Sequence, residues 1–233
     1  MIADLRGVLL DLDGTLLDHR GAADRAVVAW ARQLGLSDDP DPVARWRRAE
    51  SQHYPQFERG ECSFQEQRRR RVRAFSSALA GVDDERADAL FDDYAAHYRQ
   101  NWQALPGAAE LIDRAFANGC RVGVLTNGDE TQQREKLAAI GLLTPDLQVF
   151  ASSTLGFAKP DARAFELACQ GLATAPSQTV MVGDDPVKDI LGARAAGLHA
   201  IQLCQDETSP AEGVVRSLWE AADLLFGDDY RQG

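Results

Sequence analysis

The chain has 233 residues, 45% of them hydrophobic and 26% charged, which is ordinary globular composition and excludes intrinsic disorder. A net charge of −11 argues against broad contact with nucleic acid, because that contact requires a positive surface. No apolar run reaches the length of about 18 residues that a membrane span needs, and the amino terminus lacks a basic stretch followed by an apolar one. We therefore expect a soluble, cytoplasmic protein with no membrane partner.

Cysteine spacing gives no sign of a metal or disulfide framework. The four cysteines are scattered without C-x-x-C spacing, so we expect buried free thiols. They are Cys62, Cys120, Cys169 and Cys204.

A short apolar run near the amino terminus ends in two acids. Residues 8–10 (Val-Leu-Leu), bounded by turn residues, predict a buried strand, and Asp11 and Asp13 follow its carboxyl end. Two carboxylates so close destabilise the fold unless a cation lies between them, which suggests a divalent metal with oxygen ligands. A calcium loop starting at Asp11 is excluded, because its sixth and twelfth positions hold Leu16 and Ala22 instead of glycine and glutamate.

The next part of the chain has a helical pattern throughout. Apolar residues recur at helical spacing over 21–35, 42–58, 63–80 and 84–101, and Ser63 with Glu66 fits a capping box. We infer an all-helical domain over residues 18–102, inserted into a core made of residues 1–17 and 103–233. The run Arg68–Arg71 spreads around a helix, so we interpret it as a solvated, salt-bridged surface rather than a polyanion site.

After Pro106 and Gly107 the pattern alternates between strand and helix. Strands that alternate with helices predict right-handed βαβ units. The fold class is therefore α/β, a doubly wound, Rossmann-like parallel sheet of five strands, whose ligands bind beyond the carboxyl ends of the strands. We expect helices at 108–118, 130–140, 161–171 and 186–196, strands at 121–126, 148–152, 178–182 and 199–203, and a closing helix at 209–226.

Polar residues follow three of these later strands. Thr126-Asn127-Gly128 ends one strand, Lys159-Pro160 precedes a helix, and an acid cluster runs from Asp184 to Asp189. Each has an ordinary structural alternative, namely a helix cap, a solvent-exposed lysine and a helix start. Their shared position at one predicted sheet edge favours a single site.

Together with the Asp11 segment, these motifs resemble the haloacid dehalogenase-like hydrolase superfamily in sequence order, and the helical insertion resembles the family's first class of cap. The resemblance implies a phosphatase in which Asp11 is the nucleophile and Asp13 the general acid and base. It implies phosphate binding by Thr126, Asn127 and Lys159. It also implies Mg²⁺ bound by Asp11, Asp13 (through its main-chain carbonyl) and Asp184, with Asp185 and Asp189 orienting those ligands.

Three alternatives remain open at this stage. A haloacid dehalogenase is disfavoured by Asp13, a phosphosugar mutase would share the aspartyl-phosphate, and a phospho-accepting signalling domain would not need the helical insertion. For the phosphatase we expect a small phosphorylated metabolite of nucleotide or sugar size. The segment 57–64, His19 and His53 are candidates to face it. The patterns make no prediction of oligomeric state.

Overall fold

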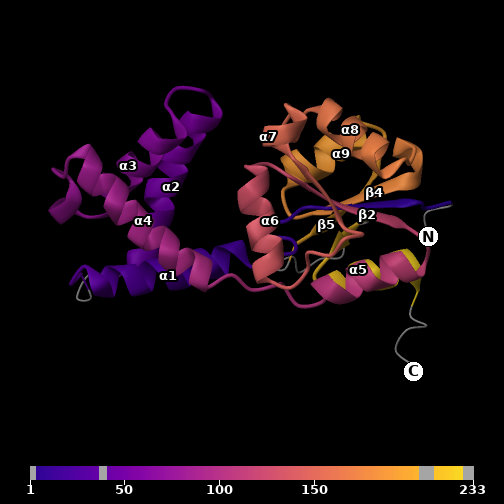
Figure 1. Cartoon of the computed structure of the whole chain (residues 1–233), viewed down its shortest axis with the longest axis horizontal. Coiled ribbons are helices and arrows are strands. Elements are labelled where there is room, and N and C mark those ends of the chain that lie inside the picture. The colour runs from indigo at the N-terminus through magenta and orange to yellow at the C-terminus, as the bar shows by residue number, and fades with distance from the viewer. Residues whose placement is uncertain (1–3, 37–40, 205–212, 228–233) are drawn as a thin grey trace. The chain divides into compact units, whose positions relative to one another are not determined.

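The computed structural model describes residues 4–36, 41–204 and 213–227 (Figure 1). The chain divides into two compact units, one made of Met1–Asp18 with Gln103–Gly233 and the other of His19–Trp102. We call the first the core unit and the second the helical unit.

The core unit is built on a parallel sheet in the order β3-β2-β1-β4-β5-β6. β1 lies in the middle, where Leu9 pairs with Gly123 of β2 and Met181 of β4. This confirms the α/β class and the doubly wound parallel sheet. The strands are β1 (Gly7–Leu10), β2 (Arg121–Thr126), β3 (Gln148–Ala151), β4 (Thr179–Gly183), β5 (His199–Leu203) and β6 (Val214–Val215).

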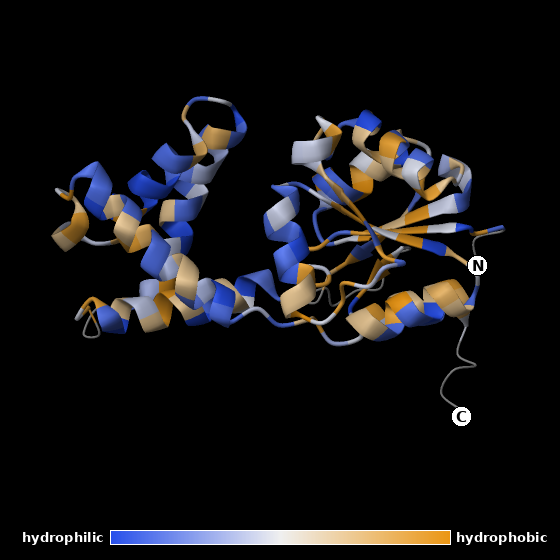
Figure 2. Ribbon diagram, in the orientation of Figure 1, coloured by the Kyte–Doolittle hydropathy of each residue, from blue (hydrophilic) through white to orange (hydrophobic). Residues whose placement is uncertain are grey.

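Helices cover both faces of this sheet. α8 and α9 pack together on one face and α5 lies on the other (Figure 1), where α10 packs against it. The central strands β1 and β4 are buried at every residue because helices cover both faces of the sheet. Figure 2 shows apolar (orange) residues along the strands. The helices are α5 (Ala108–Ala117), α6 (Glu130–Ala139), α7 (Ser152–Leu155), α8 (Ala162–Leu172), the 3₁₀ turn η2 (Pro176–Gln178), the π-helix η3 (Pro186–Leu191), α9 (Gly192–Ala195) and α10 (Leu218–Phe226).

In the part of the chain that the structure describes the sheet has six strands, so the predicted number of five is wrong. The additional strand is β6, which pairs with β5. With two residues, β6 is too short to show a periodic pattern. The predicted helix 209–226 starts later, at Leu218, because Ser217 caps it by accepting a hydrogen bond from the Glu220 N–H at 3.1 Å. Residues 209–212 lie outside the described residues. The predicted regular helix over 186–196 begins as a π-helix.

The helical unit has an aromatic core. The rings of Trp30, Trp46, Phe75 and Tyr94 lie with centroids 4.4–5.9 Å apart in the contacting pairs. All four side chains are buried. Its helices are α1 (His19–Gln33), α2 (Pro42–Glu58), α3 (Phe64–Phe75), the 3₁₀ turn η1 (Ser77–Leu79) and α4 (Asp84–Gln100).

Only part of the arginine run on α3 lies on the surface of the helical unit. Arg69 and Arg70 form ion pairs with Asp88 and Glu66, at 2.6 and 2.8 Å, in agreement with the predicted salt-bridged face. Arg71 departs from it, since it is 6% exposed and its guanidinium lies 4.5 Å from the Trp46 ring centre. The run is therefore also part of the packing of this unit.

Two further expectations concern the whole chain. All four cysteines are free, as predicted, but only Cys120 and Cys169 are buried, while Cys62 and Cys204 are partly exposed. Among the helices that the structure describes, none combines the length and apolarity needed to cross a bilayer.

Candidate active site

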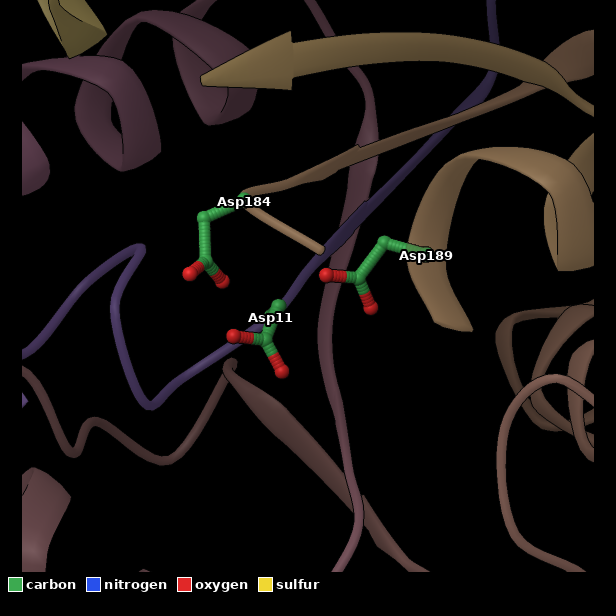
Figure 3. A group of neighbouring side chains, drawn as sticks. All are labelled: Asp11, Asp184 and Asp189. Atoms are coloured by element: carbon green, nitrogen blue, oxygen red, sulfur yellow. The ribbon is translucent and has the colours of Figure 1, made fainter. Parts of the chain in front are cut away.

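Three aspartates meet beyond the carboxyl ends of β1 and β4 (Figure 3). Asp11 follows β1 directly, and its N–H donates to the Val182 carbonyl of β4 at 2.9 Å. Asp184 follows β4, and Asp189 lies on the π-helix η3. One oxygen from each of the three carboxylates lies within 4.8 Å of the others. The central strands of the sheet thus bring together acids that are far apart in the sequence.

Lys159 is buried between two of these acids. Its Nζ donates to Oδ1 of Asp11 and to Oδ1 of Asp189, both at 2.6 Å, and the side chain is 3% exposed. Burial alone lowers the pKa of Lys159, but attraction to Asp11 and Asp189 outweighs burial and holds the pKa above its usual value. Lys159 is therefore a fixed positive charge beside Asp11.

The two oxygens of Asp189 both have donors. Oδ1 accepts from Lys159 and Oδ2 accepts from the Asp185 N–H at 3.0 Å. On Asp184, Oδ1 accepts a long hydrogen bond of 3.4 Å from Thr15 Oγ1. Asp11 and Asp184 are therefore better placed than Asp189 to bind an added cation.

The aspartates carry more negative charge than the site neutralises. Burial raises the pKa of Asp11 to about 6 even though Lys159 lowers it. Burial, and then repulsion from Asp11, raises the pKa of Asp184 to about 6. Burial also raises the pKa of Asp189. Such shifts indicate a site that favours a further cation, and oxygen ligands of this kind are those that Mg²⁺ prefers.

Two glycines make room for these carboxylates. Gly14 has a φ of 101°, and a Cβ there would lie 2.5 Å from Oδ2 of Asp184. A Cβ on Gly183 would overlap the carboxyl group of Asp189. Glycine is therefore needed at both positions for the acids to converge.

Asp13 lies against α6 instead of among the other acids. Lys136 Nζ donates to Oδ1 and Oδ2 of Asp13 at 2.7 and 2.6 Å, and Gln133 Nε2 lies 3.2 Å from Oδ2. The structure pairs the carboxylate of Asp13 with a buried cation and an amide.

The Thr-Asn-Gly motif occupies the end of β2. Thr126 is 1% exposed, and its Oγ1 accepts from Gln133 Nε2 at 2.6 Å. Both ends of the Asn127 amide bind the main chain of Lys159: Nδ2 donates to its carbonyl and Oδ1 accepts from its N–H, each at 2.8 Å. Asn127, predicted to bind phosphate, is thus seen to fix the backbone of Lys159.

Asp185, expected to orient metal ligands, caps the π-helix. Its Oδ1 accepts from the N–H groups of Val187 and Lys188, both at 2.8 Å. Its own N–H holds Asp189. Its link to the acid cluster runs through its main chain.

Comparison with known proteins identifies the family. Residues 5–197 match the family described as haloacid dehalogenase-like hydrolase. The chain belongs to the haloacid dehalogenase-like hydrolases.

Three relatives illustrate the range of this hydrolase family. A phosphoserine phosphatase from Thermus thermophilus is 38% identical over 133 residues, or 56% of this chain and 53% of that protein, so the match spans about half of each. A ribulose-1,5-bisphosphate 5-phosphatase from Halopiger xanaduensis is 30% identical over 88% of this chain and 87% of its own length. The crystal structure of the putative hydrolase YfnB from Bacillus subtilis, described as bound to magnesium, has a TM-score of 0.78 at 24% identity, covering 95% of this chain and 98% of that one.

Sequence reasoning missed two side chains of the site in this haloacid dehalogenase-like hydrolase. Gln133 and Lys136 are 2% and 5% exposed although both are polar. Their spacing of three residues places them on one face of α6, just after Thr126-Asn127-Gly128. That spacing was the available signal, but a polar helical face usually meets solvent.

Proposed function

We propose that this chain is a magnesium-dependent phosphomonoester hydrolase that acts on a small phosphorylated metabolite through an aspartyl-phosphate. The observation that carries the proposal is a buried carboxylate, Asp11, held 2.6 Å from the fixed cation Lys159 at the edge of the sheet where ligands bind. Relatives named as phosphatases support the reaction class.

The donor set fits Mg²⁺. Asp11 and Asp184 would hold the ion with their side chains and Asp13 with its main-chain carbonyl, while Asp189 holds Lys159. The bound ion would neutralise charge on the phosphoryl group and on the acids around it. The magnesium bound in the YfnB structure supports this choice of metal.

In the first half of the reaction, a carboxylate oxygen of Asp11 attacks phosphorus. The bond between phosphorus and the leaving oxygen breaks, and that oxygen keeps the electron pair and takes a proton from Asp13. Lys159 and the hydroxyl of Thr126 stabilise the charge on the transferring phosphoryl group. The products are an aspartyl-phosphate at Asp11 and the alcohol.

In the second half, water attacks the phosphorus of the aspartyl-phosphate. Asp13 now accepts a proton from that water, and the bond between phosphorus and the Asp11 oxygen breaks. Asp11 returns as a carboxylate and inorganic phosphate leaves. One residue, Asp13, serves both halves because it alternates between acid and base.

The helical unit is expected to limit substrate size. The two segments that connect the helical unit to the core unit lie side by side. The Asp18 N–H donates to the Gln103 carbonyl at 2.9 Å, and Leu17 forms an antiparallel β-bridge with Ala104. Asp18 is close in sequence to Asp13, so we propose that the insertion acts as a lid that excludes water and large substrates. We therefore expect the substrates to be metabolites of nucleotide or sugar size.

A metabolite panel tests the proposed function. We expect phosphate release from at least one sugar or nucleotide monophosphate with MgCl₂, no release with EDTA, and no release by Asp11→Asn. Formation of an isomeric phosphate without phosphate release would indicate a mutase. Halide release from 2-haloacids that persists in EDTA would indicate a dehalogenase and contradict the proposal.

A further inference from the structure

We propose that Gln133 and Lys136 of α6 are positioning residues for the two halves of the reaction, Lys136 for Asp13 and Gln133 for Thr126. The inference rests on the proposed phosphatase function. It adds two side chains that orient the acid–base group and the phosphate-binding hydroxyl. It assigns to α6 a part in the chemistry that neither the four motifs nor the acid cluster supplies.

Lys136 holds Asp13 by both oxygens. The two distances from its Nζ, 2.7 and 2.6 Å, leave the Asp13 carboxyl group little freedom to turn. Lys136 is 5% exposed, so water does not compete for its ammonium group, while Asp13 is more open on its other side, with a side chain 27% exposed. A group that acts as acid and base must be held in one orientation, here by Lys136, and must also be accessible to the substrate.

Gln133 sets the direction of the Thr126 hydroxyl. The carboxylate of Asp13 can only accept hydrogen bonds, so the Gln133 atom that faces it at 3.2 Å is the amide nitrogen. The same nitrogen lies 2.6 Å from Thr126 Oγ1, which therefore accepts. The hydroxyl hydrogen of Thr126 is then left to be donated to a phosphoryl oxygen. One amide thus links the phosphate-binding residue to the acid–base residue.

The turn before α6 is built to admit this amide. A Cβ on Gly128 would lie 3.2 Å from Gln133 Nε2 and 3.3 Å from its Cδ, closer than ordinary side-chain contact. Asp129 starts the helix by accepting from the Gln132 N–H at 3.1 Å. The helix start therefore lies where its fourth and seventh residues, Gln133 and Lys136, reach back to Thr126 and Asp13.

The leaving group distinguishes positioning from structural support. An alkoxide needs a proton from Asp13 as it departs, whereas a dinitrophenolate does not. The assay measures kcat and KM on glycerol phosphate and on 2,4-dinitrophenyl phosphate, with saturating Mg²⁺. Lys136→Met should lower kcat/KM on glycerol phosphate by about 100-fold and on dinitrophenyl phosphate by less than about 5-fold, because it displaces the proton donor. Lys136→Gln can still donate a hydrogen bond to Asp13 and should recover part of the loss. It replaces Lys136→Met in the comparison if the methionine variant does not fold.

Gln133→Leu should give a different signature. It disturbs Thr126, which contacts the phosphoryl group that both substrates share, so KM should rise on both. Gln132→Leu is the matched control, because it makes the same chemical change one residue earlier. Arg134→Met is the control for removing a cation from α6, since the Arg134 side chain is 45% exposed and pairs with Glu130. Both controls should retain wild-type kinetics.

A double-mutant cycle completes the test. In an Asp13→Asn background, Lys136→Met should change turnover of dinitrophenyl phosphate and glycerol phosphate by less than about 3-fold, because its partner is already disabled. An equal loss on both substrates, or a loss that persists fully in the Asp13→Asn background, would overturn the positioning role and leave the phosphatase proposal intact. A wild-type protein that hydrolyses neither these esters nor any metabolite in the panel would overturn both.

Discussion

Replacing Asp11 with asparagine should abolish turnover and also stabilise the metal-free protein. Burial raises the pKa of Asp11 from 3.8 to about 6 despite the neighbouring Lys159. A shift of about 2 units corresponds to about 3 kcal/mol, since one unit is worth about 1.4 kcal/mol, and this is the cost of keeping Asp11 ionised in the folded state above pH 6. Asparagine removes that cost but loses a charge-assisted hydrogen bond to Lys159, which is worth about 2 kcal/mol, so we expect a net gain of about 1 kcal/mol.

The sign of the pH dependence follows from the direction of the shift. Because the folded-state pKa of Asp11 lies above the unfolded value, the folded wild-type protein holds the extra proton between about pH 4 and pH 6. Wild-type stability from this group therefore falls as the pH rises through that window. The advantage of Asp11→Asn should be absent near pH 4 and complete above pH 6.

Urea unfolding in EDTA at pH 4.5 and pH 8 measures this difference. Asp113→Asn, an exposed aspartate on α5, is the matched control and should change the free energy of unfolding by less than about 0.5 kcal/mol. Saturating Mg²⁺ should reverse the order, because the ion stabilises the wild type by about 2.7 kcal/mol at 100 times its dissociation constant. An Asp11→Asn protein that is less stable than wild type in EDTA at pH 8 would refute the reasoning.

Three further predictions concern metal and substrate. The Mg²⁺ affinity measured by calorimetry should fall below pH 6, because the pKa values of Asp11 and Asp184 are raised to about 6. The fall should be about tenfold per pH unit for each proton that Mg²⁺ displaces. An association constant that is the same from pH 5 to pH 8 would contradict this. Asp184→Ala should lose Mg²⁺ binding, whereas Asp13→Asn should keep it and lose most of its turnover, and equal loss of binding in both would refute the division of roles. Small metabolites should exceed a phosphopeptide and a 5′-phosphorylated oligonucleotide in kcat/KM, and a better polymer substrate would show that the insertion does not act as a lid.

The parts of the fold that repeat a pattern were predictable from the sequence. Buried parallel strands are mostly apolar segments, and the predicted strands 121–126 and 199–203 match β2 and β5 at both ends. Val214–Val215 could not be found in this way, because two residues are too few to show a period. The π-helix was also hidden, since a single wide turn changes the hydrogen bonds of the backbone without changing the spacing of apolar residues.

In the candidate site, residue types were predictable and partners were not. Asp11, Asp184 and Lys159 stand directly at strand ends or beside a turn, where the chain direction alone brings them to one edge. The double hydrogen bond between Asn127 and Lys159 joins residues 32 positions apart, and the contact of Lys136 with Asp13 spans 123 positions. Such contacts depend on how far α6 and the Lys159 loop rotate when they pack, which no local pattern encodes.

The most direct test of the account is to trap the phosphoryl group on Asp11. In Asp13→Asn, dinitrophenyl phosphate should still transfer its phosphoryl group, because its leaving group needs no proton, whereas hydrolysis of the product should be slow for want of a base. Acid-quenched protein analysed by peptide mass spectrometry should then carry one phosphoryl group on the peptide that contains Asp11. Asp11→Asn should carry none. A phosphoryl group on another residue, or no covalent species although dinitrophenolate is released, would contradict the central claim.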